Sequence, residues 1–220
     1  MIELNRLSKT YSISGKTIEA LRQTDLSIQQ GEFVSIVGHS GSGKSTFLSL
    51  VGGIARPDTG TVAIDGTDIW TYNDKQLSKL RNEKFGFVYQ FASLIPTLNA
   101  TDNVLLPTVF GGKKTRTDAV ALLKLVGLGE KIDRYPSELS GGEQQRVAIA
   151  RAFIHDPEII LADEPTGDLD EETEAEIMSF FEKTNKEKKV TMIMVTHSSE
   201  IAKRAQTRFR MKQGLLERLH

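Results

Sequence analysis

The sequence contains no cysteine. Disulfide bonds and thiolate metal sites are therefore excluded, and the absence suits a reducing compartment. An excess of one charge is also lacking, because 28 lysines and arginines nearly balance 29 aspartates and glutamates, which leaves a net charge of −1. Proteins that bind nucleic acid normally carry a basic excess, so we expect no nucleic-acid partner.

Long apolar runs are missing as well. The longest runs, such as IILA and MIMV, are far shorter than the roughly 20 residues that a membrane-spanning helix needs. The first residues, MIELNRLSKTY, lack the basic region and apolar stretch of a secretory signal. We therefore expect a cytoplasmic protein that reaches a membrane only through a partner.

Short β-rich apolar segments alternate with helical ones along the chain. Strands are expected at 33–38, 61–66, 85–90, 158–165 and 190–197. Several of these segments are apolar on both faces, as in a buried parallel sheet. Helices are expected at 44–54, 115–126, 143–154 and 171–181, and a solvated loop at 185–189. This alternation predicts an α/β fold with a mostly parallel core sheet.

Two segments depart from this alternation. Residues 1–30 have the pattern of an antiparallel sheet, and residues 91–155 consist mainly of helix and loop. We therefore predict one domain over 1–220. Its core, with an N-terminal antiparallel β-subdomain, is formed by 1–90 and 156–220, and residues 91–155 form an inserted helical subdomain.

The segment GHSGSGKST follows an expected strand and opens an expected helix. It fits G-x-x-x-x-G-K-[ST], the pattern of a phosphate-binding loop. Glycines let backbone N–H groups approach phosphates, Lys44 adds an ammonium group, and Ser45 offers a hydroxyl to Mg²⁺. A flexible glycine–serine turn is the alternative, which the strand–loop–helix context disfavours. The expected nucleotide contacts are Gly38, His39, Ser40, Gly41, Ser42, Gly43, Lys44, Ser45 and Thr46.

The strand end EIILADEP carries paired acids. We expect Asp163 to hold Mg²⁺ and Glu164 to polarise the attacking water, because phosphoryl transfer needs positioning and charge neutralisation. His197 ends the next strand at the same edge of the sheet, where it is expected to contact the γ-phosphate or Glu164. The alternatives are acids that cap the turn before Pro165 and a structural histidine.

A second glycine-containing helix start is formed by Ser140, Gly141, Gly142 and Glu143. A capping box explains the serine and the glutamate. It does not explain two adjacent glycines, each of which costs up to about 1 kcal/mol relative to alanine in a helix. Glycines at this place let an anion approach exposed N–H groups. Because the first loop already serves its own nucleotide, the second start is predicted to serve the nucleotide of another copy.

With LSGGEQQR at 139–146, the sequence resembles ATP-binding cassette (ABC) ATPases over almost its whole length. The resemblance implies a P-loop NTPase fold of ABC type and a head-to-tail homodimer around two ATP molecules with Mg²⁺. It implies that Ser140, Gly141, Gly142 and Glu143 contact the partner's nucleotide. His39 stands where proline is frequent, and Glu143 stands where glutamine also occurs.

The same resemblance assigns further roles. Tyr11 stacks on adenine, with a strand-surface tyrosine as the alternative, and Asp170 belongs with 167–169 to the loop that links the two ATP sites. Gln90 senses Mg²⁺ and contacts a membrane partner. The expected metal contacts are Ser45, Gln90 and Asp163, and the expected catalytic residues are Lys44, Gln90, Glu164 and His197.

Residues 87–107 and 135–152 are similar to the branch that serves lipoprotein-releasing, macrolide-exporting, antimicrobial-peptide-resistance and cell-division permeases. The branch implies an ATPase that drives a separate integral membrane permease, of export or extraction type, from the inner face of the cell membrane. A transmembrane signalling switch without transport has the same motifs and stays open. The apolar segment 91–96 is expected to be either a groove for a permease helix or core of the helical subdomain.

Overall fold

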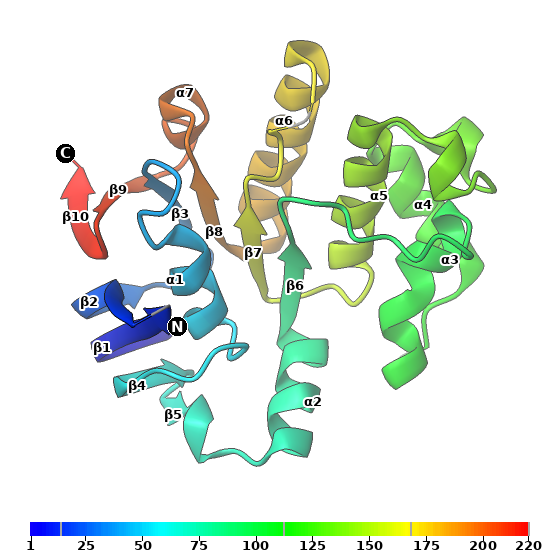
Figure 1. Ribbon diagram of the computed structural model, residues 1–220. Coiled ribbons are helices and arrows are strands. Elements are labelled where there is room, and N and C mark those ends of the chain that lie inside the picture. Colours follow the sequence, from blue (N-terminus) through cyan, green and yellow to red (C-terminus); the bar gives the residue numbers. More distant parts are fainter. Residues whose placement is uncertain (14, 112, 168, 220) are drawn as a thin grey trace.

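The computed structural model describes residues 1–13, 15–111, 113–167 and 169–219. The larger of its two sheets has the strand order β10-β9-β3-β8-β7-β6 (Figure 1). Strands from β9 to β6 are parallel, and β10 pairs antiparallel with β9. The strands are β3 (Phe33–Val37), β6 (Phe85–Val88), β7 (Ile159–Asp163), β8 (Thr191–Thr196), β9 (Thr207–Lys212) and β10 (Leu215–Leu219). The predicted α/β fold with a mostly parallel core sheet is confirmed.

The second sheet is antiparallel, with the order β2-β1-β4-β5. Its strands are β1 (Ile2–Ile13), β2 (Lys16–Ile28), β4 (Thr59–Ile64) and β5 (Thr67–Asp68). The segment expected as a strand at 61–66 therefore pairs with the N-terminal strand, Ile2 opposite Ile64, and takes no part in the core sheet. Strand β4 ends at Ile64, and only its last three residues, 62–64, are buried, because β4 offers a single apolar end to the space between the sheets.

Helices cover both faces of the core sheet. They are α1 (Lys44–Val51), α2 (Asp74–Lys84), α3 (Ala100–Leu105), α4 (Arg116–Leu125), α5 (Gly141–Phe153), α6 (Glu171–Lys188) and α7 (Ser199–Ala202). Short 3-10 turns lie at Ile69–Thr71, Leu106–Phe110, Gly129–Lys131 and Pro136–Glu138. No helix within the described ranges is long and apolar enough to cross a membrane.

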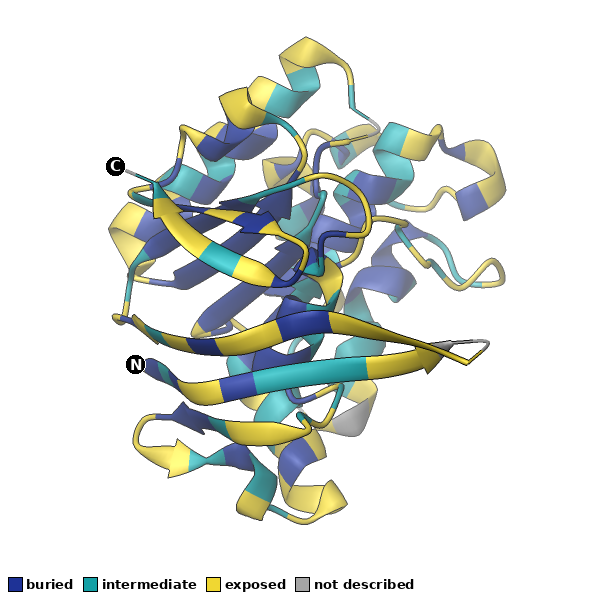
Figure 2. Ribbon diagram, turned by 60° about the vertical axis from the view of Figure 1, so that its left-hand side comes forward, coloured by how far each residue is buried: buried dark blue, intermediate teal, exposed yellow. Residues whose placement is uncertain are grey.

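Two apolar clusters show how the layers are held together (Figure 2). Along β8, Met192 and Met194 face the cluster shared with α5 and α6, whereas Ile193 and Val195 face the cluster shared with α1 and the antiparallel sheet. Alternate side chains of a strand point to opposite faces, so an all-apolar strand is buried on both. Helices α1 and α5 therefore lie on opposite faces of the core sheet.

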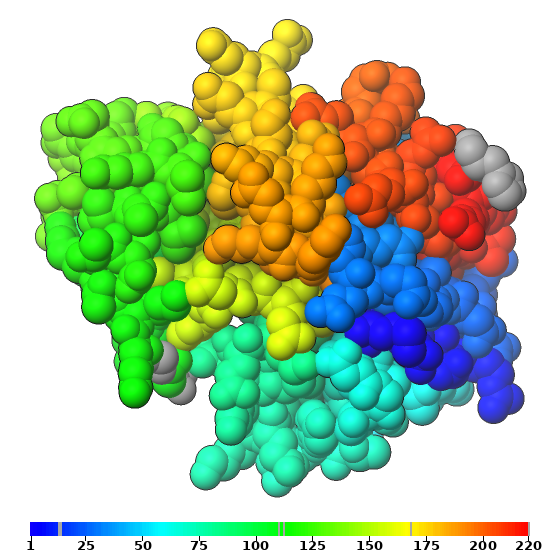
Figure 3. All heavy atoms as spheres, turned by 180° about the vertical axis from the view of Figure 1, so that it is seen from behind, coloured from blue at the N-terminus to red at the C-terminus, as the bar shows by residue number. Residues whose placement is uncertain are grey.

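The helical segments after β6 gather on one side of the molecule. Figure 3 shows the residues around 100–135 as a lobe, away from the two ends of the chain. Within this region, α5 also packs against β6. The division of the chain near residues 90 and 155 stays a prediction.

The prediction of a loop at 185–189 is wrong, because α6 continues to Lys188. Asn185 is 2% exposed, and its amide donates to the Gly31 carbonyl (2.9 Å) and the Val190 carbonyl (2.8 Å). The charged side chains of 186–188 lie on the solvent side of this last turn. Their run of charge resembles a loop in sequence, although the buried asparagine anchors the helix end.

Helix α2 was not expected from the sequence. It begins with a capping box between Asn73 and Gln76, but Leu77 is its only buried residue. An apolar stripe is the usual sign of an amphipathic helix, and here that stripe is nearly absent.

Candidate functional site

Three adjacent parallel strands bring the predicted chemical residues to one edge of the core sheet. In the register of β3, β8 and β7, Val37 lies opposite Thr196, and Val195 lies opposite Asp163. The phosphate loop, Glu164 and His197 follow directly at these strand ends. Ligands of open parallel sheets gather at the carboxyl ends of the strands. The structure therefore places these residues together, while their roles stay predictions.

The phosphate loop is closely packed from behind. Gly43 caps α1 with φ 110°, and a Cβ there would lie 2.0 Å from the Ala20 carbonyl oxygen of β2. A Cβ at Gly38 would lie 2.4 Å from the Met211 carbonyl oxygen of β9. Sequence reasoning explained these glycines by the approach of phosphates alone. The two glycines also allow the backbones of β2 and β9 to contact the loop closely.

Lys44 is the first residue of α1, directly after the bend of this loop, and only 8% of its side chain is exposed. Its ammonium donates to the carbonyl oxygens of Gly38 (2.7 Å) and His39 (3.2 Å) and lies 3.7 Å from Glu164 Oε1. Such a buried cation needs partners, and carbonyls and a carboxylate supply them here. The Lys44 side chain thus links the loop to the acidic strand end.

Glu164 is held by two groups of His197. Its Oε2 accepts from the backbone N–H of His197 (3.1 Å) and lies 2.9 Å from Nδ1 of the same histidine. The glutamate side chain is 10% exposed, whereas that of His197 is 69% exposed. Glu164 also has φ 47°, an uncommon value for a residue other than glycine. Of the two contacts expected for His197, the structure shows the one to Glu164.

Asp163 and Ser45 meet beside this glutamate. Burial raises the pKa of Asp163 above its usual range, a hydrogen bond from Ser45 and the charge of Lys44 lower it, and Glu164 raises it. A hydroxyl and a carboxylate are oxygen donors that suit Mg²⁺, which commonly binds through one or two carboxylates and the phosphates of a substrate. The residues present therefore fit a magnesium ion.

Gln90 lies exposed just beyond β6, the strand next to β7. No cluster of three or more histidine, aspartate or glutamate residues that could bind a metal occurs in the described part of the chain. The protein would therefore supply few ligands of its own to an ion at this edge.

The second helix start has the predicted capping box. Ser140 Oγ accepts from the Glu143 N–H (3.2 Å), and Glu143 Oε2 accepts from the Ser140 N–H (2.9 Å). Glu143 also pairs with Lys131. Gly141 is exposed, and a Cβ there would meet open space. Its backbone is thus accessible to a ligand from outside the chain.

Tyr11 and Asp170 have other contacts in the structure. Tyr11 is 37% exposed on β1, opposite Ile18, and Lys9 Nζ lies 5.4 Å from its ring centroid. Asp170 caps α6 by accepting from the N–H (3.0 Å) and hydroxyl (2.8 Å) of Thr173, which lowers the pKa of Asp170. Asp168, in the same predicted loop, lies outside the described residues.

Sequence reasoning missed two side chains of α5 that hold the segment after β6. The amide of Gln145, 2% exposed, donates to the Tyr89 carbonyl (2.9 Å). Arg151 donates to the carbonyls of Ala92 (2.7 Å) and Ser93 (3.0 Å). Gln145 and Arg151 follow Gly141 by 4 and 10 residues, and in the sequence they look like ordinary surface residues of a helix. Only the packing of α5 on β6 shows their use.

The apolar segment 91–96 is divided between the two expected roles. Leu94 packs against the cluster of α5 and α6, as core of the helical region would. Phe91 is 71% exposed, and Ile95 is 40% exposed. A surface for a partner would therefore include Phe91 and leave Leu94 inside.

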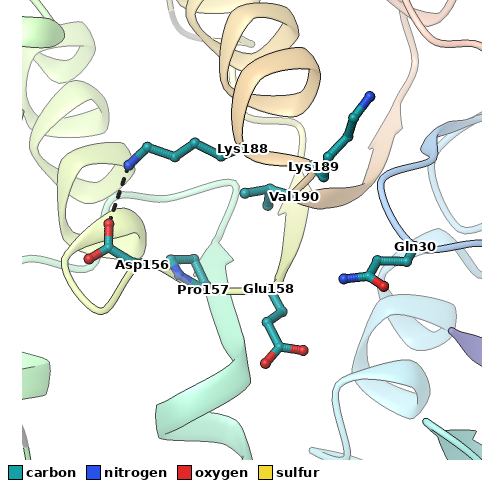
Figure 4. Close-up of a pocket in the computed structure, with 7 residues that line it drawn as sticks. All are labelled: Gln30, Asp156, Pro157, Glu158, Lys188, Lys189 and Val190. Atoms are coloured by element: carbon teal, nitrogen blue, oxygen red, sulfur yellow. Dashed lines mark hydrogen bonds and ion pairs between the residues drawn. The ribbon is translucent and has the colours of Figure 1, made fainter.

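A separate hollow of about 210 Å³ lies at the opposite edge of the core sheet (Figure 4). It is lined by Gln30, Asp156, Pro157, Glu158, Lys188, Lys189 and Val190. Gln30, Glu158 and Val190 each precede a core strand, and Lys188 pairs with Asp156 at 3.3 Å. None of the predicted site residues lines this hollow.

Known proteins resemble the chain along most of its length. The profile of the ABC transporter family matches residues 21–167, a range that holds the phosphate loop, Gln90, Ser140 and Glu164. The ABC transporter ATP-binding protein YknY of Bacillus subtilis is 48% identical over 92% of this chain and 89% of the relative. The lipoprotein-releasing system ATP-binding protein LolD of Syntrophus aciditrophicus is 42% identical over 97% of each chain.

Two further comparisons concern a fused relative and a solved structure. The macrolide export ATP-binding/permease protein MacB of Chlorobium phaeobacteroides is 48% identical, and the chain spans 33% of its length. The ATP-binding cassette MJ0796, from Methanocaldococcus jannaschii, has been solved as a post-hydrolysis dimer bound to ADP and Pi. It is 41% identical with a TM-score of 0.94, over 100% of this chain and 99% of that one. The chain therefore belongs to the ABC transporter family.

Proposed function

We propose that this chain is the ATP-hydrolysing subunit of a transporter, and that it dimerises head to tail around two ATP molecules with Mg²⁺. The observation that carries the proposal is the position of Glu164, held by His197 and 3.7 Å from Lys44 beside the phosphate loop. A carboxylate held in this way is suited to polarise a water at the end of a bound triphosphate.

The residues of the loop would act first on the phosphates. Backbone N–H groups at the start of α1 face the carboxyl edge of the sheet, where the helix dipole favours negative charge. Lys44 would exchange its carbonyl partners for phosphate oxygens. Ser45 and Asp163 would hold Mg²⁺, which neutralises charge on the phosphates when bound.

Glu164 and His197 would act on the water. His197 donates to Glu164 through its backbone and lies within hydrogen-bond distance through its ring, so it fixes the direction of the carboxylate. With Glu164 directed in this way, its carboxylate can take a proton from the water as the water oxygen bonds to the γ-phosphorus. The bond from that phosphorus to the bridging oxygen then breaks, and ADP leaves with phosphate. Gln90, exposed beyond β6, would sense the bound nucleotide from the neighbouring strand.

The second copy would supply the other helix start. Helices α1 and α5 pack on opposite faces of the core sheet, and Gly141 at the start of α5 is exposed to a ligand from outside the chain. Ser140, Gly141, Gly142 and Glu143 would therefore meet the nucleotide of the partner, and Asp170 would lie near the link between sites. Tyr11 would stack on adenine.

A separate integral membrane permease would receive the motion of the dimer, and the chain would lie on the inner face of the cell membrane through that permease. The exposed Phe91 and its neighbours supply an apolar surface for it. Relatives named for lipoprotein release and for macrolide export support an export or extraction type. The fused relative includes a permease in the same chain.

Replacing Glu164 tests the proposal. We expect Glu164→Gln to lower ATP turnover by about 10²- to 10⁴-fold, as for loss of a general base, while ATP then holds the variant as a dimer. Turnover is measured by phosphate release, and the dimer by size-exclusion chromatography with light scattering. Glu158→Gln changes an exposed carboxylate at the other end of β7 and serves as the matched control. Rapid hydrolysis by Glu164→Gln would remove this residue from the role of base.

The same variant identifies the membrane partner. Tagged Glu164→Gln protein is purified from detergent-solubilised membranes of its native cells, with and without Mg-ATP, and its partners are identified by mass spectrometry. We expect a permease to be recovered in the presence of Mg-ATP. A recovered permease that moves no substrate in vesicles would favour the signalling switch, and recovery of soluble partners alone would contradict the transport proposal.

A further inference from the structure

The turn between β9 and β10 lies directly behind the phosphate loop. Gly214 in this turn donates its N–H to the Ser42 carbonyl of the loop (2.9 Å) and accepts from the Arg22 N–H of β2 (2.8 Å). One peptide unit on each side of Gly214 thus joins the loop to the ribbon formed by β1 and β2. Figure 2 shows the strand that ends at C beside the ribbon of β1 and β2, of which β1 begins at N and β2 is the outer strand.

Gly214 also leaves no room for a side chain. Its φ is +76°, and a Cβ there would lie 2.6 Å from the Glu19 carbonyl oxygen of β2. A contact of that length essentially never occurs with backbone, so a side chain would displace the ribbon by several tenths of an ångström. Glu19 lies opposite Thr10, and its neighbour Ile18 lies opposite Tyr11.

We propose that the β9–β10 turn is a positioning element of the nucleotide site, in which Gly214 sets the distance between the phosphate loop and Tyr11 on the β1–β2 ribbon. The inference rests on the proposed function, because it takes the loop as the phosphate contact and Tyr11 as the adenine contact. The inference adds Gly214 to the site, a residue that lies far from the phosphate loop and from Tyr11 in the sequence.

A side chain at position 214 would displace the ribbon of β1 and β2 and leave the phosphate loop in place. The loop is held to the core sheet by the hydrogen bond from Gly38 N to the Thr196 carbonyl (3.2 Å) and by the contacts of Lys44. Residues 16–19 of β2 are exposed, and within the described part of the chain this end of β2 pairs with β1 and with no other strand. Gly214→Ala should therefore shift the base contact and spare the phosphate contact.

ADP and inorganic pyrophosphate separate these two contacts, because only ADP carries the base. We expect Gly214→Ala to weaken ADP binding by about five- to tenfold, the size of one lost base–aromatic stack, and to change pyrophosphate binding by less than about twofold. Calorimetry measures the ADP affinity, and competition against a fluorescent ADP analogue measures that of pyrophosphate. If Gly214→Ala weakens the binding of both ligands equally, or leaves the affinity for ADP unchanged, the proposal is overturned.

Gly66→Ala is the matched control. Gly66 has φ +80°, but a Cβ there would meet nothing within 4 Å, so this variant has the same backbone strain without the clash. It should leave both affinities unchanged. If Gly66→Ala weakens ADP as much as Gly214→Ala does, the effect is one of strain, and the proposal is wrong.

A double-mutant cycle separates this inference from the proposed function. Tyr11→Ala should weaken ADP binding, and Gly214→Ala should add nothing to it, because both act through the same ring. If Tyr11→Ala alone has no effect, the adenine contact of the proposed function is wrong. If Tyr11→Ala weakens ADP binding but Gly214→Ala does not, or the two effects add, the turn proposal alone is wrong.

Hydrogen exchange on the unmodified protein gives a test that does not depend on a variant folding. The Arg22 amide, which donates to Gly214, should gain at least about threefold more protection with saturating ADP than with saturating pyrophosphate, because only ADP bridges the loop and the ribbon. Equal protection by the two ligands would contradict the proposal.

Discussion

At the scale of single residues, the candidate site combines buried charges that are costly for the fold. Asp163 is an acid whose pKa burial raises, and it lies next to a second carboxylate, Glu164. The Ser45 hydroxyl and the Lys44 ammonium offset part of this cost. Such an arrangement is expected where charge is needed for binding and chemistry rather than for stability.

Asp163→Asn should therefore stabilise the fold at neutral pH while it abolishes Mg²⁺-dependent ATP turnover, by at least about 10²-fold. A raised folded pKa means that the native state binds the proton more readily than the unfolded state. Ionised Asp163 therefore destabilises the folded state at pH values above its raised pKa. This destabilisation disappears as the pH falls below the ordinary pKa of an aspartate, about 3.9.

Urea unfolding of both proteins across this pH range measures the effect. The stability difference between Asp163→Asn and the unmodified protein should shrink as the pH falls. A variant that is less stable at neutral pH would show that the carboxylate of Asp163 contributes net stabilisation to the empty site.

At the scale of elements, α5 connects the two surfaces that the proposed mechanism has to coordinate. Its N-terminus carries Ser140, and its side chains Gln145 and Arg151 hold the backbone of the segment that follows β6. A movement of this helix would carry Phe91 with it. The hydrogen bonds to backbone carbonyls fix the segment whatever its side chains are.

Phe91→Glu should uncouple the chain from its permease. Because the Phe91 side chain is 71% exposed, we expect basal ATP turnover within about twofold and a free energy of unfolding within about 0.5 kcal/mol of the unmodified protein. Permease-stimulated turnover should fall several-fold in reconstituted vesicles. Leu125→Glu, at a 64% exposed position of α4, is the matched control.

A charge at Leu94 would test the docking surface poorly. That side chain packs against the apolar cluster of α5 and α6, so Leu94→Glu should destabilise the helical region itself. If Phe91→Glu retains full stimulation by the permease, the docking surface lies elsewhere.

At the scale of the whole molecule, α1 and α5 lie on opposite faces of the core sheet, and in the proposed dimer each nucleotide site would depend on two chains. The phosphate loop of one chain would then meet Ser140 of a second copy. A site shared in this way has a clear signature in mixed dimers.

Lys44→Ala and Ser140→Glu proteins should each fail to dimerise with ATP, because both sites of either homodimer carry the same defect. A mixture should regain dimers, since one of the two sites in the mixed dimer combines an intact loop with an intact Ser140. Light scattering in the Glu164→Gln background measures this recovery. If each chain used its own Ser140, the mixture would recover nothing.

The sequence by itself determined the local chemistry. The phosphate loop, the capping box at Ser140, and the acids at the end of β7 depend on residues a few positions apart, so their spacing predicts them. Strand-like segments were found for the same reason. The fold class was predictable because alternating short strands and helices allow few arrangements.

Only the tertiary structure decided which distant segments meet. It placed 61–64 in the antiparallel sheet, extended α6 through a charged run that Asn185 anchors, and set Gly214 behind the phosphate loop. These features depend on backbone groups far apart along the chain, whose pairing leaves no periodic trace in the residues between them. Local spacing thus defines the reactive groups, and long-range packing sets the distances at which they act.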